Sequence, residues 1–445
     1  MPKPLVAIVG RPNVGKSTLF NRLVGERLAI VTDIAGTTRD RLYADVEFAG
    51  REFTLADTGG LAFGEPTDLP GTPAAILASV RAQAREAMDA ADAIIFMVDV
   101  VQGVTPNDFE IANTLRVRQT DKPFFLVVNK ADNDMRRAEA VEFFQLGLGD
   151  PLPISALHGV GTGDLLDALL ARLPHEIAEE PRTIPRIAIV GRPNVGKSSL
   201  LNAILGEERA IVSEIPGTTR DALDTEIVWN DQPLVLIDTA GLRKRGQIDQ
   251  GIEKYSALRA LRAIQRADVA LLVIDAAEGV LAQDQHVASY ILDAGRGVVI
   301  VVNKWDKIEK DNETMINYTE QIRSVFDFIA YAPLVFVSAK TGQRVPQVID
   351  KALVARASWK MRVEDAELNE VIRDALAGHT LPARGKRVLK IYAATQLPEP
   401  PPAFLFTVND RKLIHFTYER YLENQIRARW AFEGAPLRLM FRNRG

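Results

Sequence analysis

The chain has 445 residues, which at about 150 residues per domain predicts three domains. A hydrophobic content of 47 % with 25 % charged residues excludes a disordered chain, and the absence of cysteine excludes disulfides, thiolate metal sites and cysteine nucleophiles. The net charge of −4 is uneven, because residues 358–445 hold 15 basic and 10 acidic residues, leaving 39 and 48 in residues 1–357.

The chain contains an internal repeat. GRPNVGKS occurs at 10–17 and again at 191–198, and GTTRD at 36–40 recurs at 217–221, both at an offset of 181 residues. Such self-similarity predicts two copies of one domain. We place copy 1 at 1–173, an acidic, proline-containing linker at 174–186, copy 2 at 187–357 and a third domain at 358–445.

Within each copy, short apolar runs such as IIFMV at 94–98 alternate with helical patterns. Continuous apolar strands are typical of a mostly parallel sheet covered by helices on both faces. We therefore predict two doubly wound α/β domains. In such folds a ligand binds at the carboxyl ends of the strands, where the motifs of this chain lie.

The first motif is G-x-x-x-x-G-K-S, placed between a strand and a helix in both copies. Its glycines let backbone N–H groups surround phosphate oxygens, the lysine adds a positive charge, and the serine hydroxyl binds Mg²⁺. It predicts a triphosphate site. The residues assigned to it are Gly10, Arg11, Pro12, Asn13, Val14, Gly15, Lys16, Ser17 and Thr18, and Gly191, Arg192, Pro193, Asn194, Val195, Gly196, Lys197, Ser198 and Ser199.

The second motif ends a strand in each copy, where an aspartate can hold the metal shell and a glycine N–H can face the terminal phosphate. The residues are Asp57, Thr58, Gly59, Gly60 and Leu61, and Asp238, Thr239, Ala240, Gly241 and Leu242. Leucine follows the motif where a glutamine would orient the attacking water. We therefore predict slow hydrolysis that a cation or a partner accelerates.

The third motif, NKxD, selects the base. An ionised aspartate accepts two hydrogen bonds from guanine N–H groups that adenine lacks, which predicts GTP and GDP as ligands. The residues are Asn129, Lys130, Ala131 and Asp132, and Asn303, Lys304, Trp305 and Asp306. Backbone groups of Ser155 and Ala156, and of Ser338 and Ala339, are expected at the guanine oxygen.

With these motifs the chain resembles the tandem-GTPase Der (EngA) family of Era-like GTPases over nearly its full length. The resemblance implies a role in assembly or stability of the large ribosomal subunit, contact with rRNA and a KH-like third domain. It also implies catalytic roles for Lys16, Thr38, Lys197 and Thr219, Mg²⁺ held by Ser17, Thr38, Asp57, Ser198, Thr219 and Asp238, and K⁺ held by Asn13 and Asn194.

Residues 358–445 predict a small α+β domain with a helix at 360–376, strands at 387–394 and 403–409, a helix at 418–430 and a strand at 437–441. Its positive charge favours RNA, although a solvated surface or a packing partner for the acidic domains fits equally. No GxxG occurs there, so KH likeness rests on the resemblance. Phe404 and Phe406 alternate as core residues do. RNA candidates are Arg384, Lys386, Arg387, Lys390, Arg411 and Lys412.

The second switch differs between the copies, and Arg243, Lys244 and Arg245 of copy 2 could meet RNA, a neighbouring domain or only solvent. Besides a ribosome-assembly GTPase, two functions stay open. One is a nucleotide-dependent RNA-binding scaffold with little turnover, and the other is a GTPase of tRNA modification or transport. No apolar run reaches the roughly 18 residues of a membrane span, and no secretory signal is recognisable, so we expect a cytoplasmic protein. Because two switch domains in one chain already provide an intramolecular pair, we expect a monomer.

Overall fold

The computed structural model describes residues 3–25, 43–58, 82, 84–85, 87–117, 122–174, 183–212, 224–239, 257–311, 313–379, 381–384 and 387–444. The chain divides into two compact units. Unit 1 comprises Met1–Pro181 and Lys254–Gln265, and unit 2 comprises Arg182–Glu253 and Arg266–Gly445. No helix within the described ranges is long and apolar enough to cross a membrane.

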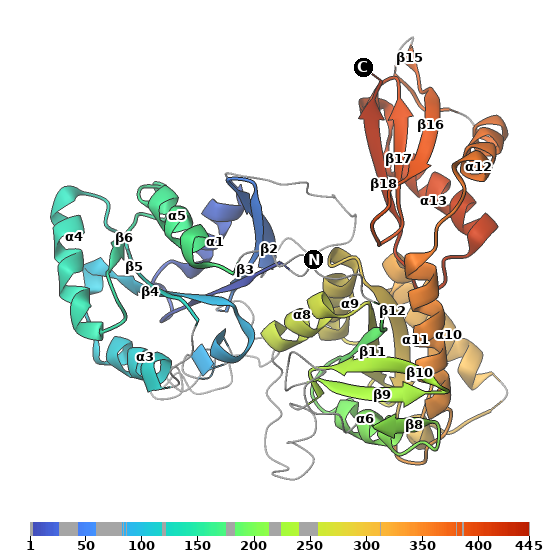
Figure 1. The fold of residues 1–445 in the computed structure, drawn as a ribbon, viewed down its shortest axis with the longest axis horizontal. Helices are drawn as coiled ribbons and strands as arrows, with labels where there is room; N and C mark the ends of the chain where they lie inside the picture. The colour runs from blue at the N-terminus through green and yellow to red at the C-terminus, as the bar shows by residue number, and fades with distance from the viewer. Residues whose placement is uncertain are drawn as a thin grey trace. The chain divides into compact units, whose positions relative to one another are not determined.

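The described part of unit 1 contains a six-stranded sheet in the order β2-β3-β1-β4-β5-β6 (Figure 1). Only β2 runs antiparallel to its neighbour, and the other pairs are parallel. The predicted doubly wound arrangement is confirmed. The strands are β1 (Leu5–Val9), β2 (Tyr43–Phe48), β3 (Arg51–Asp57), β4 (Ala93–Asp99), β5 (Phe124–Asn129) and β6 (Leu152–Pro153).

Helices cover both faces of this sheet because alternate residues of β1 point to opposite sides. Val6 and Ile8 pack with α1 (Lys16–Gly25) and α5 (Thr162–Arg172), whereas Leu5 and Ala7 pack with α3 (Pro106–Val117) and the 3₁₀ segment η2 (Ala140–Leu146). A short helix α4 (Asp134–Glu139) precedes η2. Helix α8 (Ala257–Arg266) contributes Leu258 and Leu261 to the core of unit 1.

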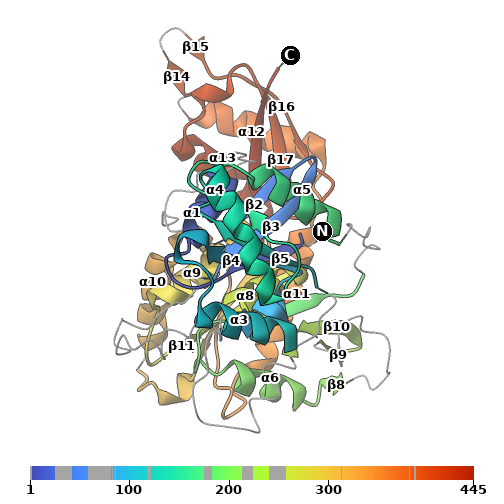
Figure 2. The ribbon, with the colours of Figure 1, turned by 90° about the vertical axis from the view of Figure 1, so that its left-hand side faces the viewer.

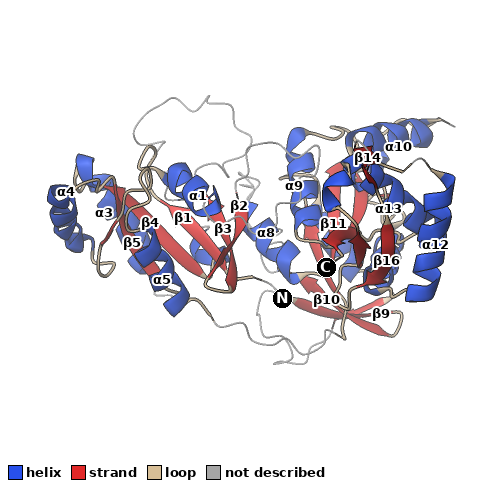
Figure 3. Ribbon diagram, turned by 90° about the horizontal axis from the view of Figure 1, so that it is seen from above, coloured by secondary structure: helices blue, strands red, loops and turns tan. Residues whose placement is uncertain are grey.

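Unit 2 contains a seven-stranded sheet in the order β13-β12-β11-β7-β10-β9-β8, in which β8, β9 and β10 pair antiparallel and the rest are parallel. Figure 3 shows helices flanking these strands. The strands are β7 (Arg186–Val190), β8 (Ala210–Val212), β9 (Thr225–Trp229), β10 (Gln232–Ile237), β11 (Val269–Asp275), β12 (Gly297–Asn303) and β13 (Leu334–Phe336).

Helix α11 (Val345–Lys360) joins two cores of unit 2. Its residues Val348 and Ala352 pack on the seven-stranded sheet with α6 (Lys197–Leu205), whereas Trp359 belongs to the core of the C-terminal domain. The Trp359 indole N–H also donates to the carbonyl of Gly295 at 2.7 Å. One rigid helix therefore ties the two parts of unit 2 together. Within the described ranges, α9 (Ala282–Asp293) and α10 (Thr314–Val325) also accompany this sheet.

The C-terminal domain is an α+β domain, as predicted. Strands β16 (Ile391–Gln396), β17 (Ala403–Val408) and β18 (Arg438–Asn443) form a sheet in that order, β17 and β18 being parallel. Helices α12 (Asp365–Gly378) and α13 (Phe416–Trp430) complete it, and a hairpin of β14 (Ala383–Arg384) and β15 (Arg387–Val388) lies at its tip (Figure 2). Phe404 and Phe406 are fully buried, which confirms their assignment to the core.

Candidate functional site

The loop at residues 10–15 leaves the end of β1, which lies between β3 and β4 where the strand order reverses. Gly15 has φ +100°, and a Cβ there would lie 2.3 Å from the Asn129 side-chain nitrogen. Gly196 of copy 2 repeats this geometry with φ +94° and 2.3 Å to the Asn303 nitrogen. Only glycine meets both demands, so the backbone can close into the predicted phosphate-binding loop.

The lysine of each loop starts the following helix and lies back over the loop. Lys16 Nζ donates to the carbonyls of Gly10 at 2.9 Å and Arg11 at 2.8 Å. Lys197 donates in the same way to the carbonyl of Arg192. Burial lowers the pKa of Lys16, although the nearby negative charge of Asp57 acts in the opposite direction and raises it. Each ammonium group is therefore held at the helix N-terminus that would receive phosphate.

The arginine of each loop extends away from the lysine. Arg11 Nε donates to Asp108 at 2.7 Å, and Arg192 Nε donates to both oxygens of Asp284 at 2.9 and 2.8 Å. Burial raises the pKa of Asp284. Our assignment of both arginines to nucleotide binding did not anticipate these partners. The offset of 176 residues between the two aspartates, shared with Asp99 and Asp275, was a usable signal.

The serine and aspartate assigned to Mg²⁺ lie together in copy 1. Ser17 Oγ donates to Asp57 Oδ2 at 2.5 Å, and Asp57 is buried at the end of β3. In copy 2, Ser198 Oγ is buried and has no hydrogen-bond partner within the described ranges. A hydroxyl beside a carboxylate, or an orphaned buried hydroxyl, fits a hard cation that takes oxygen ligands.

The asparagine of NKxD connects three motifs. Asn129 Nδ2 donates to the carbonyl of Val14 at 2.8 Å, and its Oδ1 accepts from the N–H of Ala156 at 2.9 Å. Asn303 makes the equivalent bonds at 2.9 and 3.0 Å. The sequence assigns backbone groups of this alanine and the preceding serine to the guanine oxygen, and in the structure the alanine N–H donates to the asparagine. The asparagine thus fixes the phosphate loop and the predicted base-recognition loops relative to one another.

The lysine of NKxD is fixed by an aspartate that sequence reasoning missed. Lys130 Nζ lies 2.6 Å from Asp99 at the end of β4, and Lys304 Nζ lies 2.6 Å from Asp275 at the end of β11. Both lysines have positive φ, 64° and 60°, a conformation uncommon outside glycine. Each ion pair therefore fixes the lysine ammonium group at the end of a neighbouring strand.

The NKxD aspartates, which the sequence predicts to select the base, are each held by a serine side chain. Ser155 Oγ donates to Asp132 Oδ1 and Ser338 Oγ donates to Asp306 Oδ1, both at 2.6 Å. The hydrogen bond from Ser338 lowers the pKa of Asp306. The sequence predicts only backbone roles for these serines, whereas in the structure their hydroxyls orient the carboxylates.

The two copies differ around the same carboxylate. In copy 1, Arg136 lies 3.0 Å from Asp132 Oδ2, and Arg22 Nε donates to the carbonyl of Ala156 at 3.1 Å. In copy 2, Lys310 lies over the Trp305 ring at 5.8 Å instead. In copy 1 an arginine therefore contacts the carboxylate that the sequence predicts to read guanine.

Several predicted site residues lie outside the described ranges. These are Thr38, Gly59, Gly60, Leu61, Thr219, Ala240, Gly241 and Leu242, together with the basic segment at 243–245 and Lys386.

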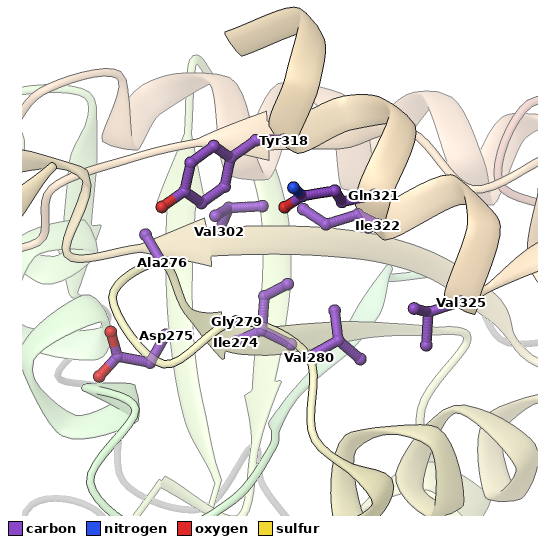
Figure 4. A pocket seen from close by; sticks show the side chains of 10 residues that line it. All are labelled: Ile274, Asp275, Ala276, Gly279, Val280, Val302, Tyr318, Gln321, Ile322 and Val325. Carbon is purple, nitrogen blue, oxygen red and sulfur yellow. The ribbon is translucent and has the colours of Figure 1, made fainter. Parts of the chain in front are cut away.

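A cavity of 190 Å³ lies in unit 2 between α10 and the carboxyl ends of β11 and β12. In Figure 4, Tyr318 and Gln321 of α10 face Ala276 and Asp275 across it. None of the residues that line it belongs to the phosphate loop or to NKxD. It therefore lies beside the nucleotide motifs rather than among them.

Known proteins match both the repeat and the C-terminal domain. A family model described as a 50S ribosome-binding GTPase matches residues 5–130 and 186–304, and one described as the KH-domain-like C-terminal part of EngA bacterial GTPases matches 362–442. GTPase Der of Chloroflexus aggregans is 53 % identical over all of this chain and 99 % of its own length.

The chain belongs to the Der family of GTPases. GTPase Der of Lactococcus lactis subsp. lactis is 52 % identical and that of Geobacillus thermodenitrificans 51 %, each covering 100 % of both chains. As a Der-family member, the protein binds guanine nucleotide and hydrolyses GTP, with two tandem GTPase domains followed by a KH-like domain.

Proposed function

We propose that this Der-family GTPase acts in assembly or stability of the large ribosomal subunit and binds rRNA through its C-terminal domain. Two features support the proposal. The family model that matches both GTPase domains is described as ribosome-binding, and the C-terminal domain gathers exposed positive charge. A cytoplasmic monomer, with domains at 1–173, 187–357 and 358–445 around a linker at 174–186, is part of this proposal.

The exposed cations of the C-terminal domain come from two segments that hydrogen bonds hold side by side. Asn409 accepts from the Lys390 N–H at 2.8 Å and donates to the Val388 carbonyl at 2.8 Å. This brings residues 387–390 next to residues 410–412 at one end of the sheet. Such a cluster would contact the phosphates of RNA and displace the counterions bound to them, which favours binding. Its exposed cations are Arg387, Lys390, Arg411 and Lys412.

In the proposed nucleotide chemistry, Lys16 and Lys197 would neutralise the outer phosphates, and Thr38 and Thr219, which lie outside the described ranges, would join Mg²⁺ and the γ-phosphate. Mg²⁺ would be held by Ser17, Thr38 and Asp57 in copy 1 and by Ser198, Thr219 and Asp238 in copy 2. When bound, the ion neutralises charge that develops on the phosphate oxygens.

Potassium stimulation is a further part of the proposal. Asn13 and Asn194, both with positive φ, would hold K⁺ against the phosphates. Leu61 and Leu242 offer no hydrogen bond to the attacking water, so the cation would supply acceleration that the side chains do not. GTP turnover that is equally fast in Na⁺ and K⁺ would rule this out.

Co-sedimentation with purified ribosomal subunits tests the ribosome role. We expect the protein to pellet with the large subunit in a non-hydrolysable GTP analogue and less so with GDP. The variant Lys390→Glu/Lys412→Glu should lose this association as salt rises while its GTP hydrolysis stays unchanged, because both residues lie outside the nucleotide site. Equal pelleting with both subunits, or none in either nucleotide, would contradict the proposal.

A further inference from the structure

The phosphate loop of each copy is attached to a neighbouring helix by a buried ion pair. Asp108 and Asp284 lie in the first turns of α3 and α9 and are fully buried. Arg11 donates to Asp108 at 2.7 Å, and Arg192 donates to both oxygens of Asp284 at 2.9 and 2.8 Å. Each arginine has a second, more exposed partner, which is Gln102 for Arg11 at 2.8 Å and Glu278 for Arg192 at 2.9 Å. The aspartate is the fully buried partner in each copy, and removing one member of a buried pair leaves the other charge poorly compensated.

Each aspartate is itself held in place. Asp108 Oδ2 accepts from the N–H of Thr105 at 3.0 Å and from its hydroxyl at 2.7 Å. Asp284 Oδ2 accepts from the N–H of Leu281 at 3.0 Å. The carboxylates are thus fixed to the starts of their helices. Each aspartate therefore positions the arginine, and not the reverse.

The same arginine that binds the aspartate through its side chain binds the lysine through its backbone. Lys16 Nζ donates to the carbonyl of Arg11 at 2.8 Å, and Lys197 donates to the carbonyl of Arg192. A short chain of contacts therefore runs from the helix carboxylate through the arginine to the phosphate-binding lysine.

This chain of contacts occurs in both copies. Each aspartate follows a shared Gly-Val pair, at 103–104 and at 279–280, and is separated from it by three residues that differ between the copies. The aspartate therefore recurs at an equivalent position, and in both copies it contacts the arginine of the phosphate loop.

We propose that Asp108 and Asp284 are positioning residues for GTP hydrolysis. Each orients the phosphate-binding lysine of its own copy through the arginine of GRPNVGKS. The inference rests on the proposed assignment of Lys16 and Lys197 to the triphosphate. It does not depend on the ribosome role.

The test uses the full chain with copy 1 silenced by Lys16→Ala, so that only copy 2 turns over GTP. In this background, Asp284→Asn keeps an acceptor for the Leu281 N–H but removes the charge that orients Arg192. We expect the KM for GTP to rise about tenfold and kcat to fall about tenfold, because a misplaced charge costs binding and transition-state stabilisation together. Calorimetry should still find one nucleotide site per chain.

Two further variants separate positioning from folding. Arg192→Lys keeps the positive charge beside Asp284 but loses the two-point contact, so it should lose less activity than Arg192→Ala. The double variant Arg192→Ala/Asp284→Ala should be no slower than Arg192→Ala alone, because that single variant already removes the contact with Asp284. If the activity losses of the two single variants multiply in the double variant, the inference is wrong.

The outcomes distinguish a failure of this inference from a failure of the assignment of Lys16 and Lys197 to the triphosphate. If Asp284→Asn lowers the number of binding sites while the remaining sites keep wild-type KM and kcat, the role is structural and the inference is wrong. Unchanged KM and kcat at full occupancy overturn it as well. Lys197→Ala is the reference: if that variant still binds and hydrolyses GTP normally, the lysine assignment itself fails.

Discussion

Replacing Asp306 by asparagine should change which nucleotide copy 2 binds. Ser338 Oγ donates to Asp306 Oδ1 at 2.6 Å, so an asparagine would place its oxygen there and its NH₂ group at the position of Oδ2. Guanine presents two donors to this carboxylate, and one of them would then face the NH₂ group. Xanthine carries a carbonyl at that position and would accept from it.

The size of the effect follows from the bonds exchanged. Hydrogen bonds to a charged group contribute about 1.5–3 kcal/mol each, so two weakened bonds correspond to about 3–6 kcal/mol, or roughly 10²–10⁴-fold in Kd. Calorimetry on the full chain should find two GDP sites in the wild type. Asp306→Asn should show one GDP site and one new site for xanthosine diphosphate.

Asp132→Asn is the matched variant in copy 1, where Arg136 also contacts the carboxylate. Each variant should change the nucleotide specificity of its own copy from GDP to xanthosine diphosphate and leave the other copy unchanged. Two intact GDP sites in Asp306→Asn, or no binding of xanthosine diphosphate, would refute the reasoning that this carboxylate reads the base.

The pH dependence of copy 2 follows from the same serine. The hydrogen bond from Ser338 lowers the pKa of Asp306, and guanine binding needs the ionised form. Binding is therefore complete above that pKa and is lost as pH falls through it. Ser338→Ala should raise the pKa, so that GDP affinity at copy 2 falls at a higher pH than in the wild type. Identical acid limbs in GDP titrations would contradict this.

Three smaller predictions follow from single contacts. Arg136→Ala should raise the GDP affinity of copy 1 up to about fivefold at low salt, because an exposed pair with Asp132 is worth at most about 1 kcal/mol; a fall in affinity in nucleotide titrations would contradict it. Gly196→Ala should abolish GDP binding at copy 2, since its Cβ would meet Asn303 at 2.3 Å, and calorimetry that still counts two sites would count against it. Phe404→Ala should lower the opening free energy of β17 amides by about 3–5 kcal/mol in hydrogen exchange, and unchanged protection would show that this core tolerates the cavity.

Much of the fold and the outline of the site could be predicted because the relevant signals are local. A glycine-rich turn, a lysine and a serine are consecutive residues between a strand and a helix, and their repetition 181 positions later makes coincidence improbable. Continuous apolar strands likewise predicted a parallel sheet, which places the carboxyl ends of several strands at one edge. The α+β pattern of the last 88 residues was equally readable from its periodicity.

The tertiary structure decided which side chains hold the motif residues. Arg11 and Asp108 are 97 positions apart, and Ser155 and Asp132 are 23 apart. Helix packing and loop length bring such partners together. Because neither requires a fixed number of residues between the two partners, the sequence does not reveal the pair. The motifs therefore named the groups that would touch the nucleotide, whereas only the folded chain showed what orients each of those groups.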